Sequence, residues 1–371
     1  MRIGVNTRLL LPGTLEGIGR FTHEVLSRMV KDHPEDDFYF FFDRSCDVKY
    51  LYAPNVTPVV LGPQSRHPVL WYLWFEKSIS KALIKHKIDV FFTPELYCCL
   101  SVDIPTLMIV HDLAYLHYPR HIQFSHRTYL KYFVPRFIER ADLIGCVSKA
   151  TEDDVRSRFQ VGDHKLFVSY NGPTPGFHAL SDEERAEVRD EITGGIPYFV
   201  YIGSMHPRKN IGRLILAFDQ FIQHNPTARH KLVLVGRLAW KSGRIKEAYD
   251  NSPFKEDILP LGQRKDASRI VGAATAMVYV SLFEGFGIAI LEAMQCDIPV
   301  VTSNVSSMPE VVGGAGIKVD PKDVDSIAIG MKEVLDEDRR SQIIEEGRER
   351  LSKFSWKNTS KLIYEHLNKL V

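Results

Sequence analysis

The sequence lacks any long apolar run and any strong excess of charge. No stretch of its 371 residues approaches the roughly 18–20 apolar residues of a membrane-spanning helix, and the N-terminal residues contain no apolar core of signal-peptide length. Lysine and arginine total 47 against 46 acidic residues, which gives a net charge of +1, whereas proteins that coat nucleic acid normally carry a basic excess. We therefore expect a cytoplasmic protein with no nucleic-acid partner, and peripheral contact with a membrane face stays open.

Cysteine is also scarce, and the five cysteines have no spacing typical of metal ligands. An odd number of cysteines suits a reducing compartment, and the adjacent Cys98 and Cys99 are expected to be two small buried hydrophobic side chains. Asp323 and Asp325 form a D-x-D pattern, but we favour the start of a helix over a metal site, because acidic residues there cap free N–H groups. The sequence therefore predicts no metal and no cofactor.

Strands and helices alternate along the chain in two series, separated by the turn-forming run Asn171–Gly176. Apolar and β-branched runs predict strands at 2–6, 38–42, 56–61, 89–93, 106–111 and 143–147, and then at 198–203, 231–235, 258–261, 276–280 and 299–302. Helices are expected at about 21–31, 68–86, 125–140 and 181–191, and then at 210–224, after 266, and at 287–295, 324–335, 339–351 and 356–371.

This alternation is typical of βαβ units and parallel sheets. The sequence predicts an α/β protein with two Rossmann-like, doubly wound domains, residues 1–172 and 195–355, and a linker near residues 172–195. Hydrophobic residues make up 44% of the chain, which is enough for two cores. Ligands of open α/β sheets bind beyond the carboxyl ends of the strands, so we expect a ligand in a central cleft that the two domains face.

The segment Ser281–Met294, SLFEGFGIAILEAM, carries the most informative local pattern. It is expected to be the end of a strand, a loop with two glycines and the start of a helix. Glycine permits close backbone approach to a ligand, and the first helical N–H groups favour an anion. Glu284 and Glu292 would accept hydrogen bonds from hydroxyl groups, so a sugar nucleotide fits this pattern. The alternative is an ordinary strand–turn–helix with both glutamates in solvent.

Two other segments place charged residues at the ends of expected strands. Arg208 and Lys209 follow the strand at 198–203, where an arginine fork and a lysine point charge would neutralise a diphosphate. The alternative is a solvated basic turn. His111 and Asp112 end a buried strand, where a ligand of the first domain is expected, and the alternative is a histidine held by the backbone or by its neighbour.

Gly17 and Gly19 belong to segment 11–20, which is expected to be a flexible loop bordering the cleft. The glycines superficially resemble a dinucleotide-binding fingerprint, but Thr22 stands where the third glycine would be. An NAD-dependent oxidoreductase is therefore the least favoured class of function.

Aromatic and basic residues are concentrated in two segments of the first half, 71–87 and 125–140. We favour helices packed on the first sheet, with lysine side chains that extend to solvent. Contact with an anionic membrane surface is the alternative. The residues of the first segment that raise this question are Trp71, Tyr72, Trp74, Phe75, Lys77, Lys81, Lys85 and Lys87.

Taken together, the segments of the second half resemble the retaining glycosyltransferases of family 4, also called group 1, which have the two-Rossmann GT-B fold. Glu284 and Glu292 match the E-x7-E motif of that family, and the continuation 293–303 and the segment Met308–Val312 are also similar to it. The segment Pro207–Asn210, PRKN, matches the phosphate side of the family's donor site. The resemblance covers nearly the whole chain and implies that helix 356–371 crosses back to the first domain.

The resemblance also implies roles for the residues of the glycine-bearing loop. Glu284 would contact the transferred sugar and assist the reacting centre, and Glu292 would bind the ribose hydroxyls of the nucleotide. Backbone amides around Phe286, Gly287 and Ile288 would contact the donor sugar and its phosphate.

Further roles are implied for residues of both domains. Arg208 and Lys209 would bind the diphosphate, and Lys209 would be catalytic together with Glu284. His111 would approach the donor sugar as a third catalytic residue, and Gly17 and Gly19 would border the donor.

The expected function is therefore a hexosyltransferase that acts without a metal ion. Its predicted partners are a nucleotide sugar (a GDP- or UDP-hexose), a glycan or polyprenyl-diphosphate-linked saccharide acceptor of surface polysaccharide (lipopolysaccharide) biosynthesis, and the inner membrane as a peripheral contact. Segments 205–210 and 302–307 look like those of mannosyltransferases, which favours GDP-mannose, with a UDP-hexose as the alternative donor. A non-catalytic sugar-nucleotide-binding partner protein and a sugar-nucleotide epimerase are further alternatives.

One position departs from the family pattern. Many relatives carry Gly-Arg after the first strand of the second domain, where this chain has Gly203 and Ser204. We expect neutralisation of the phosphates to depend more strongly on Arg208 and Lys209.

Overall fold

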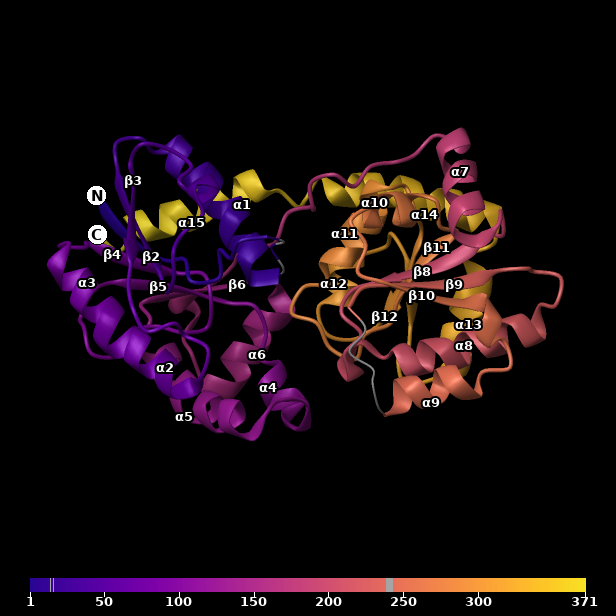
Figure 1. The fold of residues 1–371 in the computed structure, drawn as a ribbon, viewed down its shortest axis with the longest axis horizontal. Helices are drawn as coiled ribbons and strands as arrows, with labels where there is room; N and C mark the ends of the chain where they lie inside the picture. The colour runs from indigo at the N-terminus through magenta and orange to yellow at the C-terminus, as the bar shows by residue number, and fades with distance from the viewer. Residues whose placement is uncertain (14, 16, 238–242) are drawn as a thin grey trace. The chain divides into compact units, whose positions relative to one another are not determined.

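The computed structural model describes residues 1–13, 15, 17–237 and 243–371 (Figure 1). Thr14 and Glu16, which belong to the expected glycine-bearing loop, lie outside the described residues. The chain divides into two compact units, residues 1–171 with 355–371 and residues 172–354. Each unit is built on one parallel sheet.

The sheet of the first unit has seven strands in the order β3-β2-β1-β4-β5-β6-β7. All adjacent pairs are parallel, with registers such as Val5 opposite Phe40 and Phe92 opposite Leu107. The central strands are buried on both faces, as the apolar run of residues 106–110 predicts. The strands are β1 (Arg2–Asn6), β2 (Asp37–Phe42), β3 (Val56–Val60), β4 (Val90–Thr93), β5 (Thr106–Val110), β6 (Leu143–Cys146) and β7 (Leu166–Val168).

The sheet of the second unit has six parallel strands in the order β10-β9-β8-β11-β12-β13. In its own numbering this is the order 3-2-1-4-5-6 of the doubly wound nucleotide-binding fold, and the first unit repeats that order with one more strand. The predicted fold class is confirmed. The strands are β8 (Tyr198–Ile202), β9 (Lys231–Val235), β10 (Ile258–Gly262), β11 (Ala276–Tyr279), β12 (Val300–Ser303) and β13 (Ile317–Val319).

Helices cover both faces of the first sheet (Figure 1). Helices α1 and α15 pack together on one face; on the other, Trp74, Phe75 and Leu83 pack against Phe41 and Phe91. The expected helix 68–86 contains one π-helical segment, Trp74–Ile79, between α2 and α3. The helices are α1 (Gly17–Asp32), α2 (Pro68–Leu73), α3 (Ser80–Lys85), α4 (Ala114–His117), α5 (Phe124–Arg140), α6 (Lys149–Phe159) and α15 (Trp356–Asn368).

The final helix, α15, is fastened to the first unit by polar and aromatic contacts. Tyr364 Oη donates to Asp36 Oδ2 at 2.6 Å, and Ser360 Oγ donates to the Val25 carbonyl at 3.0 Å. The Trp356 ring packs edge-on against Phe21, with 5.8 Å between the ring centroids. The last residues of the chain therefore complete a unit that begins with residue 1.

The helices of the second unit also form two layers (Figure 1). Helices α8, α9 and α13 pack together on one face, and α7, α10, α11 and α14 pack together on the other. Helix α7, in the expected linker, starts with a capping box formed by Ser181 and Glu184. The helices are α7 (Asp182–Thr193), α8 (Ile211–His224), α9 (Arg244–Asn251), α10 (Ala267–Gly272), α11 (Ile288–Gln295), α12 (Met308–Val312), α13 (Val324–Glu333) and α14 (Glu337–Leu351).

Two glycines let the carboxyl ends of β8 and β9 approach each other. A Cβ atom on Gly236 would lie 1.9 Å from the Gly203 carbonyl oxygen, and both glycines have positive φ angles. A residue with a side chain at position 236 would clash with the Gly203 carbonyl. Glycine at this position therefore allows the loop after β8 to pack closely against the end of β9. Among the described residues, no helix is both long and apolar enough to cross a membrane.

Candidate active site

The turn after β8 carries Arg208 and Lys209. It is a single 3-10 turn, Pro207–Lys209, that ends at Asn210. Asn210 has a φ of +65°, and its buried Nδ2 donates to the Val280 carbonyl at 3.0 Å and to the Pro321 carbonyl at 2.6 Å. This side chain holds the basic turn against the end of β11.

Glu284 lies in the loop after β11 and forms ion pairs with both cations. Its Oε1 is 2.5 Å from Lys209 Nζ, and its Oε2 is 3.0 Å from Arg208 Nη1. Arg208 Nη1 also donates to the Phe283 carbonyl at 2.9 Å. The three side chains are 24% (Arg208), 12% (Lys209) and 7% (Glu284) exposed. The structure thus brings together three of the predicted site residues in one partly buried cluster, so the basic turn is not simply solvated.

Tyr279, at the end of β11, completes this cluster, and its sequence pattern does not predict this position. Its hydroxyl donates to Glu284 Oε1 at 2.9 Å and accepts from Lys209 Nζ at 3.0 Å. The ring stacks against Tyr201, with 6.0 Å between the ring centroids. Burial and the Glu284 carboxylate raise the pKa of Tyr279 well above its usual value, so the hydroxyl keeps its proton. An aromatic residue in a strand is usually a core residue, and nothing in the local pattern distinguishes this one.

The charge of Glu284 is fixed by its two cationic partners. Burial alone would raise the pKa of this carboxyl, but Lys209 and Arg208 outweigh burial and lower it to about 2. Glu284 therefore remains a carboxylate at any physiological pH, able to accept hydrogen bonds from hydroxyl groups. Its single negative charge pairs with both cations and offsets one of their two positive charges.

Two serines of the loop after β12 hold the backbone of the Glu284 loop. Ser306 Oγ donates to the Glu284 carbonyl at 2.6 Å and accepts from the Glu284 N–H at 3.2 Å. Ser307 Oγ lies 2.9 Å from the carbonyl oxygens of both Glu284 and Phe286. These contacts join segments that are more than twenty residues apart, so local patterns could not reveal them.

The loop leads directly into α11, as the sequence predicts. Phe286 is buried, and its ring packs edge-on against Phe354. Gly287, with a φ of +92°, precedes the helix, which begins at the partly exposed Ile288. An anion near this end would meet the first N–H groups of α11. The donor-binding roles of these residues stay predictions.

Glu292 lies inside α11 and is buried, which makes the alternative of a solvated glutamate wrong. Its Oε1 accepts a hydrogen bond of 2.6 Å from Thr174 Oγ1. Thr174 belongs to the turn-forming run that precedes α7, and its distance of 118 residues from Glu292 explains why it was not predicted. The binding of ribose hydroxyls by Glu292 stays a prediction.

His111, Gly17 and Gly19 belong to the first unit. His111 follows β5, and its Nε2 lies 2.9 Å from the Pro94 carbonyl, so the backbone holds it, as one alternative proposed. The expected loop at Gly17 and Gly19 is wrong, because α1 already begins at Gly17. A Cβ atom on Gly19 would lie 2.6 Å from the Leu9 carbonyl oxygen, so this glycine lets the first turn of α1 pack on the chain after β1.

The D-x-D pattern caps a helix, as expected. Asp323 is the N-cap of α13, and its carboxylate accepts from the Asp325 N–H at 2.9 Å. Within the part of the chain that the structure describes, no three His, Cys, Asp or Glu residues form a group that could hold a metal ion.

Solved structures of other proteins share this fold over nearly the whole chain. The structure is similar to a sucrose-phosphate synthase from Thermosynechococcus elongatus (TM-score 0.80, 18% identity, covering 100% and 98% of the two chains). It is also similar to WaaG, described as a glycosyltransferase involved in lipopolysaccharide biosynthesis (TM-score 0.75, 15% identity, covering 98% and 99%). The fold is that of the GT-B glycosyltransferases.

Family comparison identifies the chain more closely. The model for Glycosyltransferase Family 4 matches residues 15–175, and that for Glycosyl transferases group 1 matches residues 196–337. The chain therefore belongs to the group 1 glycosyltransferases of family 4 and is an enzyme. It is 27% identical to O-antigen chain mannosyltransferase B of Escherichia coli over 93% of both chains. It is 23% identical to O-antigen chain mannosyltransferase RfbU of Salmonella typhimurium over 76% of this chain and 75% of that protein.

The ion cluster predicts a pH dependence of stability. The pKa of Glu284 falls from its usual 4.5 to about 2 in the folded chain, so between these values the unfolded state binds more protons than the folded state. The stability that Glu284 contributes is complete above about pH 4.5 and is lost as the pH falls towards 2. Glu284→Gln lacks this contribution, so its urea midpoint will be lower than that of the wild type at pH 7 and will fall less steeply between pH 5 and 3.

The matched control is Glu345→Gln, which changes an exposed glutamate of α14. This variant should follow the wild-type curve. If the urea midpoints of Glu284→Gln and the wild type fell equally between pH 5 and 3, the assigned ion pairs would be contradicted.

Proposed function

We propose that this enzyme transfers a mannosyl group from GDP-mannose to a glycan or lipid-linked saccharide during synthesis of a surface polysaccharide, with retention of the anomeric configuration. The observation that carries the proposal is the cluster of Lys209 and Arg208 on Glu284 at the carboxyl edge of a doubly wound sheet. The names of the O-antigen mannosyltransferase relatives support the choice of sugar and of acceptor class. The predicted donor site uses no metal.

The proposed reaction places negative charge where the two cations lie. The bond between sugar C1 and the diphosphate oxygen breaks, and C1 forms a new bond with the acceptor oxygen on the same face. The acceptor proton passes to the departing phosphate. Lys209 and Arg208 stabilise the charge that grows on the diphosphate, and preorganised cations are effective because they need no reorientation during the reaction. Glu284, released from the cations, then accepts hydrogen bonds from sugar hydroxyls.

A UDP-hexose is the second candidate donor. A structural neighbour, HepE of Anabaena, is described in complex with UDP and glucose and has a TM-score of 0.76 at 19% identity over the full length of both chains. Both donors carry the same diphosphate, so the role proposed for the cations is the same for each.

Removing Lys209 tests the proposed function. Lys209→Ala should lower kcat about 10²-fold, as is typical when a transition-state donor is removed. Turnover is measured as release of GDP or UDP, with GDP-mannose and UDP-glucose assayed in parallel. The control is Lys322→Ala, which changes an exposed lysine of the same unit and should leave turnover unchanged. A Lys209→Ala rate within twofold of the wild type, with either donor, would overturn the assignment.

We further propose that the first unit contacts an anionic membrane surface. Residues 66–87 and 120–140 each contain five lysines and arginines and a single acidic residue, although the whole chain is nearly neutral. The acidic residue of the first segment, Glu76, is buried and accepts from the Leu100 N–H. These two segments therefore form a strongly basic part of the unit, which we call the basic aromatic surface.

The exposed side chains of this surface are both basic and aromatic. Tyr72, Phe124 and Tyr132 are 41%, 74% and 55% exposed, and Tyr72 contacts Phe133 across α2 and α5. Arg136 covers the Tyr132 ring at 3.8 Å. Trp74 and Phe75 of the same segment are core residues. Exposed aromatic side chains are stabilised in the interfacial layer of a bilayer. Lysine side chains near the surface attract anionic lipids.

Binding to vesicles tests the basic aromatic surface. The wild type should sediment with vesicles that contain phosphatidylglycerol and not with pure phosphatidylcholine, and added salt should release it. The triple variant K77Q/K81Q/K85Q should bind at least tenfold more weakly, since each lysine near the surface contributes about 1 kcal/mol. The control K332Q/K353Q/K357Q, which changes exposed lysines elsewhere, should bind like the wild type. Equal binding by the two triple variants would contradict this contact.

A further inference from the structure

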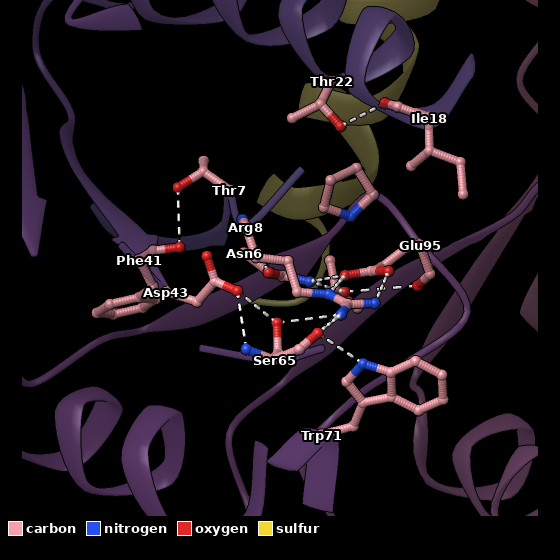
Figure 2. Close-up of polar contacts among 12 residues, drawn as sticks. Asn6, Thr7, Arg8, Ile18, Thr22, Phe41, Asp43, Ser65, Trp71 and Glu95 are labelled. Atoms are coloured by element: carbon pink, nitrogen blue, oxygen red, sulfur yellow. Dashed lines mark hydrogen bonds and ion pairs between the residues drawn. The ribbon is translucent and has the colours of Figure 1, made fainter. Parts of the chain in front are cut away.

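A network of buried polar side chains lies at the carboxyl edge of the first sheet (Figure 2). Arg8 follows β1, Asp43 follows β2, Ser65 comes after β3, and Glu95 follows β4. Each of these four residues is less than a tenth exposed. Buried charges are costly unless they are paired and hydrogen-bonded, so the contacts within the network decide its geometry.

The centre of the network is a two-pronged ion pair. Arg8 Nη2 donates to Glu95 Oε2 at 2.5 Å, and Arg8 Nε donates to Glu95 Oε1. Asn6 Nδ2 donates to the same Oε1 at 2.6 Å. The Arg8 guanidinium lies 5.0 Å from the centroid of the Tyr97 ring and also contacts Trp71 and Phe75. Burial alone would lower the pKa of Arg8, but the Glu95 carboxylate outweighs burial and raises it.

Glu95 belongs to the turn that holds His111. The Glu95 carbonyl accepts from the Tyr97 N–H at 2.8 Å, and Asn6 Nδ2 also donates to Thr93 Oγ1 at 3.2 Å. The residue between Thr93 and Glu95 is Pro94, whose carbonyl lies 2.9 Å from His111 Nε2. Proline has no N–H to anchor the turn, so the clamped Glu95 side chain fixes the carbonyl that the imidazole meets.

The Pro94 contact determines which nitrogen of His111 carries the proton. A carbonyl oxygen only accepts, so Nε2 must donate, and in the neutral ring Nδ1 then carries the lone pair. Burial lowers the pKa of His111, against the raising effects of the Pro94 carbonyl and of Asp112 and Glu95. Nδ1 has no hydrogen-bond partner among the described residues, and the Phe21 ring stands edge-on to the imidazole at 4.9 Å.

We infer that Glu95, clamped by Arg8 and Asn6, is a positioning residue that fixes the orientation and the tautomer of His111, so that Nδ1 is presented as a hydrogen-bond acceptor to a sugar hydroxyl. This inference rests on the proposed function for the identity of the ligand. The tautomer itself is a property of the enzyme without ligand. Stability alone does not require a buried ion pair, because apolar residues can often replace one without loss of stability. The position of the Arg8–Glu95 pair beside the turn that contacts His111 therefore gives it a role beyond packing.

The ring nitrogens of His111 provide the most direct test. The full chain is labelled with 15N-histidine, and its long-range 1H–15N spectrum is recorded without ligand, with His111→Gln used to assign the signal. The wild type should show a protonated Nε2 and an unprotonated Nδ1. A proton on Nδ1 in the wild type would overturn the inference, whatever the variants do and whether or not the enzyme transfers mannose.

Two isosteric variants distinguish a specific effect of Glu95 on His111 from a general effect of losing any buried carboxylate of the network. Glu95→Gln removes the charge that clamps the turn and should give a mixture of His111 tautomers, with a kcat about tenfold lower and a donor KM within threefold of the wild type. Asp43→Asn is the matched control, because Asp43 is equally buried and accepts from Ser65 Oγ at 2.7 Å but does not contact the Pro94 turn. It should leave the tautomer and kcat unchanged.

The outcomes of this comparison are distinct. A folded Glu95→Gln enzyme with the wild-type tautomer would overturn the inference, and so would an equal change of tautomer in both variants. If neither donor is consumed by the wild type, the proposed function fails, while the spectra still decide the role of Glu95.

Discussion

The ion pairs of Glu284 with Lys209 and Arg208 are the interaction on which the loops at the carboxyl ends of the second sheet depend. A buried carboxylate is costly unless it is paired, and here it pairs with the two cations and accepts from the Tyr279 hydroxyl. The cluster joins the loop after β8 to the loop after β11, so it also fixes the start of α11. In the proposed reaction a diphosphate replaces Glu284 as the partner of the cations, and the carboxylate becomes free to bind sugar hydroxyls. In that reaction, binding of the donor and release of the Glu284 carboxylate are one event.

The first unit uses the same arrangement at the equivalent place. In both sheets the chain order reverses between the first and the fourth strand, β1 beside β4 and β8 beside β11, and ligands of doubly wound sheets bind at this switch point. Arg8 and Glu95 follow the first pair of strands, and Arg208 and Glu284 follow the second. Each unit therefore has an arginine–glutamate ion pair at its switch point. The pair of the first unit is 8% (Arg8) and 3% (Glu95) exposed, whereas that of the second is 24% (Arg208) and 7% (Glu284) exposed.

The sequence predicts most of the architecture because the parallel strands are apolar runs, such as residues 106–110, and the helices between them are periodic. It also predicts Arg208, Lys209 and Glu284, since each lies in a short motif next to a strand end. The sequence does not reveal contacts between distant segments, because periodicity describes one element at a time. Thr174 and Glu292 are 118 residues apart, and Arg8 and Glu95 are 87 apart. The start of α1 at Gly17 was missed for a related reason, because the lack of a side chain at Gly19 serves packing on Leu9 and not a flexible loop.

The most direct test of the account is a calorimetric titration of GDP and UDP into the wild type and Lys209→Met without acceptor. A charged hydrogen bond contributes about 1.5–3 kcal/mol, so Lys209→Met should bind the preferred diphosphate at least tenfold more weakly than the wild type. The loss should shrink as the salt concentration rises, whereas Lys322→Met should bind like the wild type. Equal affinity of the wild type and Lys209→Met for the diphosphate would contradict the central claim that this lysine exchanges Glu284 for the donor phosphates.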